Sequence, residues 1–323
     1  MNTDGVVLGA LIEQYLVRQH ALGLIYRNGQ LVLVDLGRFL YRQGAVDLDQ
    51  TQFDAWRLSL ARLCTNQRRK QQQIVRRFCL YRQRTEPDCF IPDIPRLPRL
   101  VPCRQPVIFG EPEVARMLLA TEQLGSTSRG PLRPAVMRLA VILLYTAGLR
   151  IGELSRLTLG DVDAGHGVLR IRESKFHRSR LIPLSTDAHL ALETYLKERL
   201  TAPFPLEPAS PLLCNKAKGF RGYSIGGLRE GIQALYRMAD VRGSDGRRPR
   251  VHDMRHVFAL QALVRWYREG IDVQSQLPKL ALYMGHVSII STAYYLKWMP
   301  ALAEAASQRF DAHFGYLVEG DVS

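Results

Sequence analysis

A proline-rich segment constrains this chain more than any other feature of its sequence. Six prolines stand between positions 87 and 106, interspersed with arginines. Proline fixes one backbone dihedral and donates no backbone hydrogen bond, so such a segment sustains neither a helix interior nor a central strand. In a chain of 323 residues, long enough for two domains, we predict a basic linker over residues 87–106. It separates an N-terminal domain (residues 1–86) from a C-terminal domain (residues 107–323).

The N-terminal part has a helical pattern and an unusual charge distribution. Apolar residues recur at helical spacing over residues 10–85, although Gln30–Asp35 would also suit a brief strand. Nine basic residues and no acidic one lie between Ala55 and Thr85. A solvated charged helix is the usual explanation of such a run, but the complete lack of acids favours a surface for the DNA backbone. The candidate DNA-binding residues are Arg68, Arg69, Lys70, Arg76 and Arg77.

The overall charge narrows the class of partner. With 44 Lys plus Arg against 30 Asp plus Glu, the net charge of +14 favours a polyanion. An anionic membrane would satisfy the same charge, but no amphipathic anchor with aromatic flanks is present, and the longest apolar stretch, Leu139–Leu149, is too short to span a bilayer. Five scattered cysteines fit a reducing compartment and form no zinc pattern. We expect a cytoplasmic protein without a signal peptide or a bound metal.

The C-terminal part reads as mainly helical with one hairpin. Strands are expected over Val168–Arg172 and Arg180–Leu184, with a turn between them. The fold class is therefore mainly α with a small antiparallel β-sheet. The expected helices cover residues 111–124, 135–147, 151–157, 187–200, 224–238, 252–268, 276–283, 288–296 and 301–314.

Two places before position 200 carry residues suited to phosphate chemistry. Arg150 follows a glycine that can cap a helix, and Glu153 lies one turn on, where its carboxylate can orient the guanidinium. The planar arginine fork matches two phosphate oxygens. Lys175 stands in the hairpin turn, and a desolvated lysine readily gives up its proton. Each feature alone is more often an ordinary surface group.

Two further places lie near the C-terminal end. His252 and Arg255 share one face of a first helical turn, where anions bind readily, whereas His256 is expected to be structural or to support the residues that contact the phosphate. His286 follows a glycine, and Tyr295 comes nine residues later, beside Tyr294. Paired tyrosines on a helix usually belong to a core or an interface rather than acting as nucleophiles.

In this order, the four places closely resemble the catalytic domain of the tyrosine recombinases, the phage-type integrase family that includes Cre, Xer and lambda integrase. The resemblance covers about residues 109–310, and the domain ahead of it is similar in size and placement to the family's helical, SAM-like core-binding domain. The segments that carry it are TAGLRIGELSRLTLGDVD, SKFHRSRLIPL, HDMRHVFA and YMGHVSIISTAYYL. The hairpin reads Ser-Lys-Phe-His where relatives commonly have Gly-Lys-Gly, which leaves the reach of Lys175 open.

The resemblance implies a site-specific DNA recombinase that needs no metal, nucleotide or other cofactor. Tyr295, preferred over Tyr294 on spacing, would attack the scissile phosphate of duplex DNA and form a 3′-phosphotyrosine. The family acts as a tetramer, and residues 301–316 would form the segment exchanged between protomers. The other implied roles are general base for His252, phosphate contacts for Arg150, Arg255 and His286, leaving-group acid for Lys175, and support of Arg150 for Glu153.

Two alternatives remain open at this point. A type IB topoisomerase uses the same kind of site but relaxes DNA as a monomer. A DNA-binding accessory protein could keep the fold without catalysis, although such a protein has no need of the complete residue set.

Overall fold

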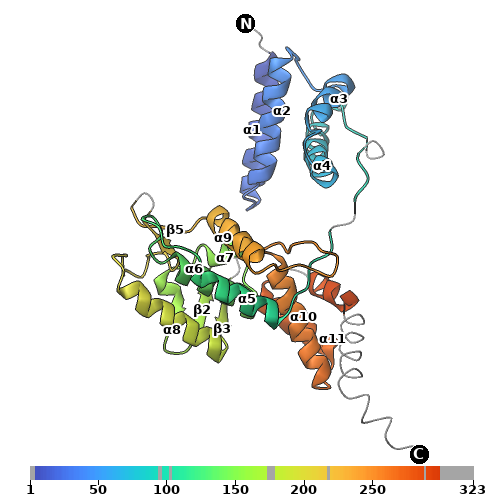
Figure 1. Ribbon diagram of the computed structural model, residues 1–323. Coiled ribbons are helices and arrows are strands. Elements are labelled where there is room, and N and C mark those ends of the chain that lie inside the picture. Colours follow the sequence, from blue (N-terminus) through green and yellow to red (C-terminus); the bar gives the residue numbers. More distant parts are fainter. Residues whose placement is uncertain are drawn as a thin grey trace, which may run out of the picture. The chain divides into compact units, whose positions relative to one another are not determined.

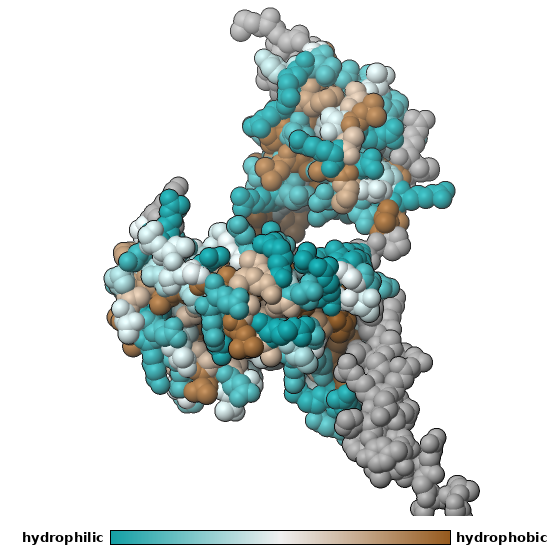
Figure 2. Space-filling view, in the orientation of Figure 1, coloured by the Kyte–Doolittle hydropathy of each residue, from teal (hydrophilic) through white to brown (hydrophobic). Residues whose placement is uncertain are grey.

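A computed structural model describes residues 4–93, 97–101, 104–172, 179–216, 219–286 and 289–298. The chain divides into two compact units, Met1–Arg104 and Gln105–Ser323. Within the described ranges, no helix combines the length and the apolar character needed to cross a membrane. On the visible face of each unit, hydrophilic side chains surround scattered apolar ones (Figure 2).

Four helices form the N-terminal unit (Figure 1): α1 (Asp4–Ala21), α2 (Arg27–Arg42), α3 (Gln50–Ser59) and α4 (Thr65–Arg82). Helix α2 contacts the other three, and one apolar core joins them. The strand alternative for Gln30–Asp35 is wrong, since this stretch lies inside α2. The reason is visible in its buried residues, Val32, Leu33, Leu36 and Leu40, which follow helical rather than alternating spacing.

The proline-rich segment is attached to α4 in its described parts. Arg69 Nη1 donates to the Pro98 carbonyl at 2.8 Å, and Arg76 Nε donates to the Pro92 carbonyl at 3.0 Å. The Asn66 side chain exchanges two hydrogen bonds with the backbone of Val101. These bonds satisfy carbonyls that the prolines leave outside any regular structure.

The C-terminal unit is built around α6 (Arg133–Thr146), which is buried over most of its surface and contacts α5, α8, α9 and α10. A three-stranded antiparallel sheet, in the order β1-β2-β3, pairs Leu169 of β2 with Ile182 of β3. Both of these side chains are buried in the same core as α6. The unit's helices are α5 (Glu111–Glu122), α6, α7 (Ile151–Leu154), α8 (Thr186–Leu200), α9 (Ile225–Met238), α10 (Asp253–Arg268), α11 (Val273–Met284) and α12 (Ile290–Ala293). Its strands are β1 (Val162–Asp163), β2 (Val168–Ile171), β3 (Arg180–Pro183), β4 (Cys214–Asn215) and β5 (Arg221–Gly222).

This architecture confirms the predicted class, mainly α with a small antiparallel sheet. The strands β1, β4 and β5 were not predicted, because two residues are too few to show a period. Where one helix was expected over residues 288–296, the short α12 is followed by a 3-10 turn, Tyr294–Trp298. The helix expected over residues 301–314 lies outside the described residues.

Candidate active site

The first part of the site is the turn from α6 into α7. Gly148 adopts a left-handed conformation (φ +58°), and a Cβ at this position would come within 2.4 Å of the Phe258 ring. Only glycine is compatible with both conditions. Arg150 then forms the N-cap of α7, and Glu153 stands in the first turn of that helix. Gly148 thus determines the direction of the backbone between the buried helix α6 and Arg150.

Glu153 is the anionic centre of the site, and its side chain is only 1% exposed. Its Oε1 accepts from Arg150 Nη1 at 2.8 Å and from Arg180 Nη1 at 3.1 Å. Its Oε2 accepts from Arg180 Nη2 at 2.8 Å and from the Arg150 backbone N–H at 3.0 Å. Burial alone would raise the pKa of Glu153, but Arg180 and Arg150 outweigh it and lower the pKa to about 2. The carboxylate is therefore ionised.

Three arginines meet at the C-terminal end of α11. Arg180 Nε donates to the Tyr283 carbonyl at 2.7 Å, Arg255 Nη2 donates to the Met284 carbonyl, and Arg150 Nη2 donates to the Gly285 carbonyl at 2.9 Å. The last carbonyls of a helix lack partners within it and carry negative partial charge, so cations suit them. Gly285 ends the helix in a left-handed conformation, where a Cβ would meet Arg180 Nη1 at 2.9 Å.

The charges of this cluster do not balance. Arg150, Arg180 and Arg255 bring three positive charges against the single negative charge of Glu153, which leaves an excess of two among these four side chains. Arg255 is 2% exposed, and its other terminal nitrogen donates to the Gly148 carbonyl at 2.5 Å. Burial and the neighbouring charge of Arg150 lower the pKa of Arg255 to about 9. Buried excess charge of this kind is stabilised by an anion.

The next residue on α10 connects the cluster to Tyr295. His256 Nδ1 lies 3.0 Å from the Tyr295 hydroxyl, and the ring of His256 meets that of His252 edge-on at a centroid distance of 4.8 Å. Tyr295 is 2% exposed, whereas Tyr294 is 36% exposed. Burial raises the pKa of Tyr295 to about 12, although Arg255 acts in the opposite sense. Burial and then the neighbouring His252 lower the pKa of His256 to about 4, so this imidazole is neutral at pH 7.

His286 follows the end of α11 directly. Its Nδ1 lies 2.8 Å from the hydroxyl of Thr292, which is fully buried at the start of the segment that carries Tyr295. A bond at one ring nitrogen fixes the ring and leaves the other nitrogen for a ligand. Burial and the charge of Arg255 lower the pKa of His286 to about 4.

The structure brings six of the predicted site residues into one region and leaves another outside the described part of the chain. Arg150, Glu153, His252, Arg255, His286 and Tyr295 are linked through the contacts above, directly or through Arg180, His256 and Thr292. Lys175 lies outside the described residues. Neither Arg180 nor Thr292 was singled out from the sequence, and His256 was expected to be structural or to support the residues that contact the phosphate. The sequence signal for His256 was weak, since it is simply four residues after His252 on one helix face.

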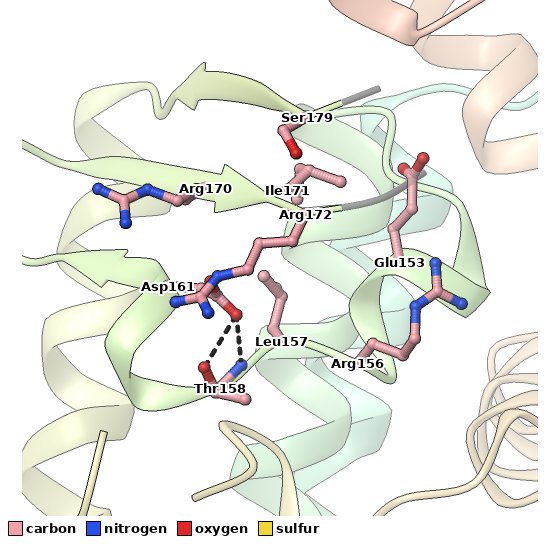
Figure 3. Close-up of a pocket in the computed structure, with 9 residues that line it drawn as sticks. All are labelled: Glu153, Arg156, Leu157, Thr158, Asp161, Arg170, Ile171, Arg172 and Ser179. Atoms are coloured by element: carbon pink, nitrogen blue, oxygen red, sulfur yellow. Dashed lines mark hydrogen bonds and ion pairs between the residues drawn. The ribbon is translucent and has the colours of Figure 1, made fainter. Parts of the chain in front are cut away.

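A groove of about 640 Å³ runs beside Glu153 along the outer face of the sheet. Figure 3 shows Arg172, which follows β2, extending toward Asp161, with which it forms an ion pair. Arg170 of β2 points away from Thr158 and Asp161, and Arg156 lies on the side of Glu153. The hydroxyl and the backbone N–H of Thr158 both donate to Asp161 Oδ2. The groove therefore joins a basic, solvent-exposed surface to the buried carboxylate of the site.

The predicted DNA-binding residues of α4 differ in their surroundings. Arg69 and Arg76 are half-buried and donate to linker carbonyls, and the half-buried Arg68 lies 3.4 Å from the Thr65 hydroxyl. Lys70 and Arg77 are exposed. The cationic run thus serves in part to hold the linker, and its exposed members remain the better candidates for a DNA contact.

Comparisons with known proteins point in one direction. Residues 111–300 match the model of the phage integrase family. Two proteins of Sinorhizobium fredii named "Putative integrase/recombinase", y4rB and y4rE, are 33% and 31% identical to the chain; the alignments cover 93% and 94% of it, and 96% and 95% of these relatives.

Solved structures agree on the fold. A XerH site-specific recombinase bound to its difH substrate has a TM-score of 0.62 at 18% identity, over 88% of this chain and 80% of that one. The Tn1549 transposon integrase in complex with transposon right end DNA has a TM-score of 0.61 at 18% identity, over 92% of this chain and 99% of that one. With more than half of the chain matched by the family model, this protein belongs to the phage integrase family of tyrosine recombinases, site-specific enzymes that cleave and rejoin DNA.

Proposed function

We propose that Tyr295 is the nucleophile of this recombinase. Its phenolic oxygen attacks the scissile phosphorus, the bond from phosphorus to the 5′-oxygen breaks, and a 3′-phosphotyrosine forms while the 5′-hydroxyl leaves. One observation carries the proposal: Arg255 and His256 are consecutive, and the first belongs to the arginine cluster at the end of α11 while the second lies 3.0 Å from the Tyr295 hydroxyl. The nucleophile and the excess positive charge are thereby held by one turn of α10.

The proposed roles of the other residues follow from their charges. Arg150 and Arg255 contact the non-bridging phosphate oxygens, whose growing charge in the transition state offsets the excess of the cluster. His286 donates to the same phosphate through the ring nitrogen not facing Thr292. Glu153 keeps Arg150 in place. Lys175 protonates the leaving 5′-oxygen.

The phenol proton needs an acceptor, because a pKa of about 12 leaves little phenolate at pH 7. We assign this role to His252, whose ring adjoins His256, the hydrogen-bond partner of the phenol. Burial and the charge of Arg255 lower the pKa of His252, so its imidazole is neutral and ready to accept a proton.

The proposed substrate is a duplex recombination site, bound by both units. The N-terminal unit acts as the core DNA-binding domain, with Lys70 and Arg77 of α4 toward the phosphate backbone. Four protomers assemble on two duplexes and exchange residues 301–316. The reaction takes place in the cytoplasm, on the DNA that carries the site.

A nicked suicide duplex tests the assignment of the nucleophile. The duplex sequence is first selected by binding to the protein, and a nick near the cleavage point lets the short 5′-hydroxyl strand diffuse away, which traps the adduct. We expect a denaturation-resistant protein–DNA adduct with the natural chain and with Tyr294→Phe, and none with Tyr295→Phe. An adduct that persists in Tyr295→Phe and disappears in Tyr294→Phe would reverse the assignment.

A further inference from the structure

The guanidinium of Arg180 makes more hydrogen bonds within the site than the guanidinium of either arginine assigned to the phosphate. Its side chain is 9% exposed, and each of its three nitrogens has an acceptor. Two nitrogens bind the two oxygens of Glu153 at 3.1 and 2.8 Å, and the third binds the Tyr283 carbonyl at 2.7 Å. Two of these bonds go to a carboxylate, so the charge of Arg180 is already paired, whereas Arg255 has only backbone carbonyls as acceptors among the described residues. Arg180 is therefore suited to hold other groups rather than to bind the DNA.

The first group held in this way is Glu153. A buried carboxylate shared by two guanidiniums has a fixed position, because rotating toward one partner weakens the bond to the other. Arg150 is oriented by this same carboxylate, through Nη1 and through its own backbone N–H. Without Arg180, Glu153 would be free to shift, and the guanidinium of Arg150 would shift with it.

The second group is the end of α11. The carbonyls of Tyr283, Met284 and Gly285 are consecutive, and they accept from Arg180, Arg255 and Arg150 respectively. Arg180 therefore fixes the first of three adjacent peptide units, and the other two carry the bonds of the phosphate-binding arginines. His286 comes next in the chain.

The position of Arg180 in the sheet adds a competing explanation. Arg180 begins β3, where it pairs with Ile171 of β2, and it lies five positions after Lys175 in the sequence. Loss of Arg180 would thus also disturb the base of the hairpin that carries the proposed leaving-group acid. An experiment must separate an effect on the phosphate contacts from an effect on proton donation.

We propose that Arg180 is a positioning residue for DNA cleavage: by fixing Glu153 and the end of α11, it keeps the guanidinium of Arg150 aimed at the scissile phosphate. This inference rests on the proposed role of Arg150. It is distinct from that role, since Arg180 itself does not touch the DNA.

The test compares single-turnover cleavage by the full-length chain and by Arg180→Gln on three versions of the suicide duplex. On the ordinary phosphate, we expect a loss of about 100-fold, the size expected when a reacting group is misplaced by about 1 Å. A methylphosphonate at the scissile position lacks one negative charge and so depends less on Arg150, and most of the loss should disappear there. A 5′-bridging sulfur leaves without a proton, and it should not rescue the variant.

Arg116→Gln is the matched control, because Arg116 also binds a carboxylate, Glu113, and a backbone carbonyl, that of Ala239. It should cleave all three duplexes as the natural chain does. In a double-mutant cycle, adding Arg150→Gln to Arg180→Gln should cost much less than Arg150→Gln alone.

Two results would overturn the inference. Equal losses on phosphate and methylphosphonate, with additive double-mutant effects, would make Arg180 a general stabiliser of the fold. Rescue by the bridging sulfur would show that it acts through the hairpin. Failure of the proposed function would look different, because the natural chain itself would then form no adduct through Tyr295.

Discussion

Two buried arginines, Arg82 of the N-terminal unit and Arg255 of the catalytic unit, differ in their counter-charges, and the difference bears on the phosphate contact proposed for Arg255. They are 4% and 2% exposed. Arg82 binds both oxygens of Asp47, at 2.7 and 2.8 Å, and also Glu86 Oε2, at 3.0 Å from its Nε. One positive charge thus faces two negative ones. Arg255 donates to two backbone carbonyls and belongs to a cluster with an excess of positive charge.

The difference appears in the direction of the pKa shifts. Burial alone would lower the pKa of either guanidinium. Asp47 and Glu86 reverse this for Arg82 and raise its pKa, whereas burial and Arg150 lower the pKa of Arg255 to about 9. Arg82 therefore has its counter-charges, Asp47 and Glu86, within the fold. Arg255 donates to backbone carbonyls rather than to a carboxylate, which fits the phosphate contact proposed for it.

Among the predictions from this comparison, replacing Arg255 has the largest expected effect, and the quantity affected is DNA cleavage. In Arg255→Gln, adduct formation should fall about 1,000-fold, because one charged donor to the transition state is lost. The variant should stay folded, because removing the guanidinium of Arg255 also removes its repulsion by Arg150. Single-turnover cleavage of the suicide duplex measures the loss. Cleavage close to that of the natural chain would show that the excess charge serves no phosphate.

Replacing Arg82 should produce the reverse pattern. Arg82→Gln leaves two carboxylates close together without a cation, and we expect the N-terminal unit to lose about 2 kcal/mol, below the range for a fully buried pair because Asp47 and Glu86 are partly exposed. Hydrogen exchange of residues 65–82 measures this. Exchange unchanged in Arg82→Gln but faster in Arg255→Gln would remove the distinction between the two arginines.

The pH dependence of the N-terminal ion pair follows from Asp47. Burial opposes ionisation of this carboxyl, but the bonds from Arg82 prevail and lower its pKa below the ordinary 3.8. A lowered folded pKa means that the unfolded chain binds the proton first as pH falls. The contribution of the pair is therefore present above about pH 4 and is lost below it, and Arg82→Gln should lack this loss.

The catalytic unit should respond to pH at a higher value, through His256. Its folded pKa of about 4 lies below the ordinary 6.5, mainly because of burial and then His252. Between these two values the unfolded chain binds about one more proton at this residue, so stability rises with pH across this window and is lost as pH falls through it. Thermal melting from pH 7 to pH 4 measures the slope. It should become less steep in His256→Asn, in which an amide replaces the titrating imidazole, while His286, whose pKa is also lowered to about 4, keeps its own contribution. An unchanged slope would contradict the assignment.

The sequence predicted the site in outline because the chemistry lies in ordered motifs. Arg150, His252, Arg255, His286 and Tyr295 stood out by residue type, but it was the resemblance to the tyrosine recombinases that joined them into one site. The mainly helical class followed from apolar periodicity. The contacts of these residues did not follow, because acceptors such as the carbonyls of Gly148 and Met284 are common to every residue.

The additional members of the site were hidden for a related reason. Arg180 resembles any strand arginine until the fold places it against Glu153, 27 positions earlier. The basic residues of α4 also show that a sequence pattern does not reveal the contacts of its side chains. Their charge pattern predicted a DNA surface, but a pattern does not reveal that Arg69 and Arg76 reach linker carbonyls 29 and 16 positions away.

The smallest expected effect concerns Gln72, a buried polar residue of α4. It is 0% exposed, and neither its amide nitrogen nor its amide oxygen has a hydrogen-bond partner among the described residues. The excess positive charge of the catalytic unit has a proposed ligand, the scissile phosphate. We propose no ligand for the Gln72 amide. Gln72→Met keeps the length of the side chain and removes the unsatisfied atoms, so it should stabilise the N-terminal unit by about 1 kcal/mol.

Gln73→Met, at the half-buried neighbouring position, is the control and should change stability little. Slower hydrogen exchange of residues 65–82 in Gln72→Met, but not in Gln73→Met, would support this account. Faster exchange in Gln72→Met would mean that the Gln72 amide stabilises the N-terminal unit, in contradiction to the prediction.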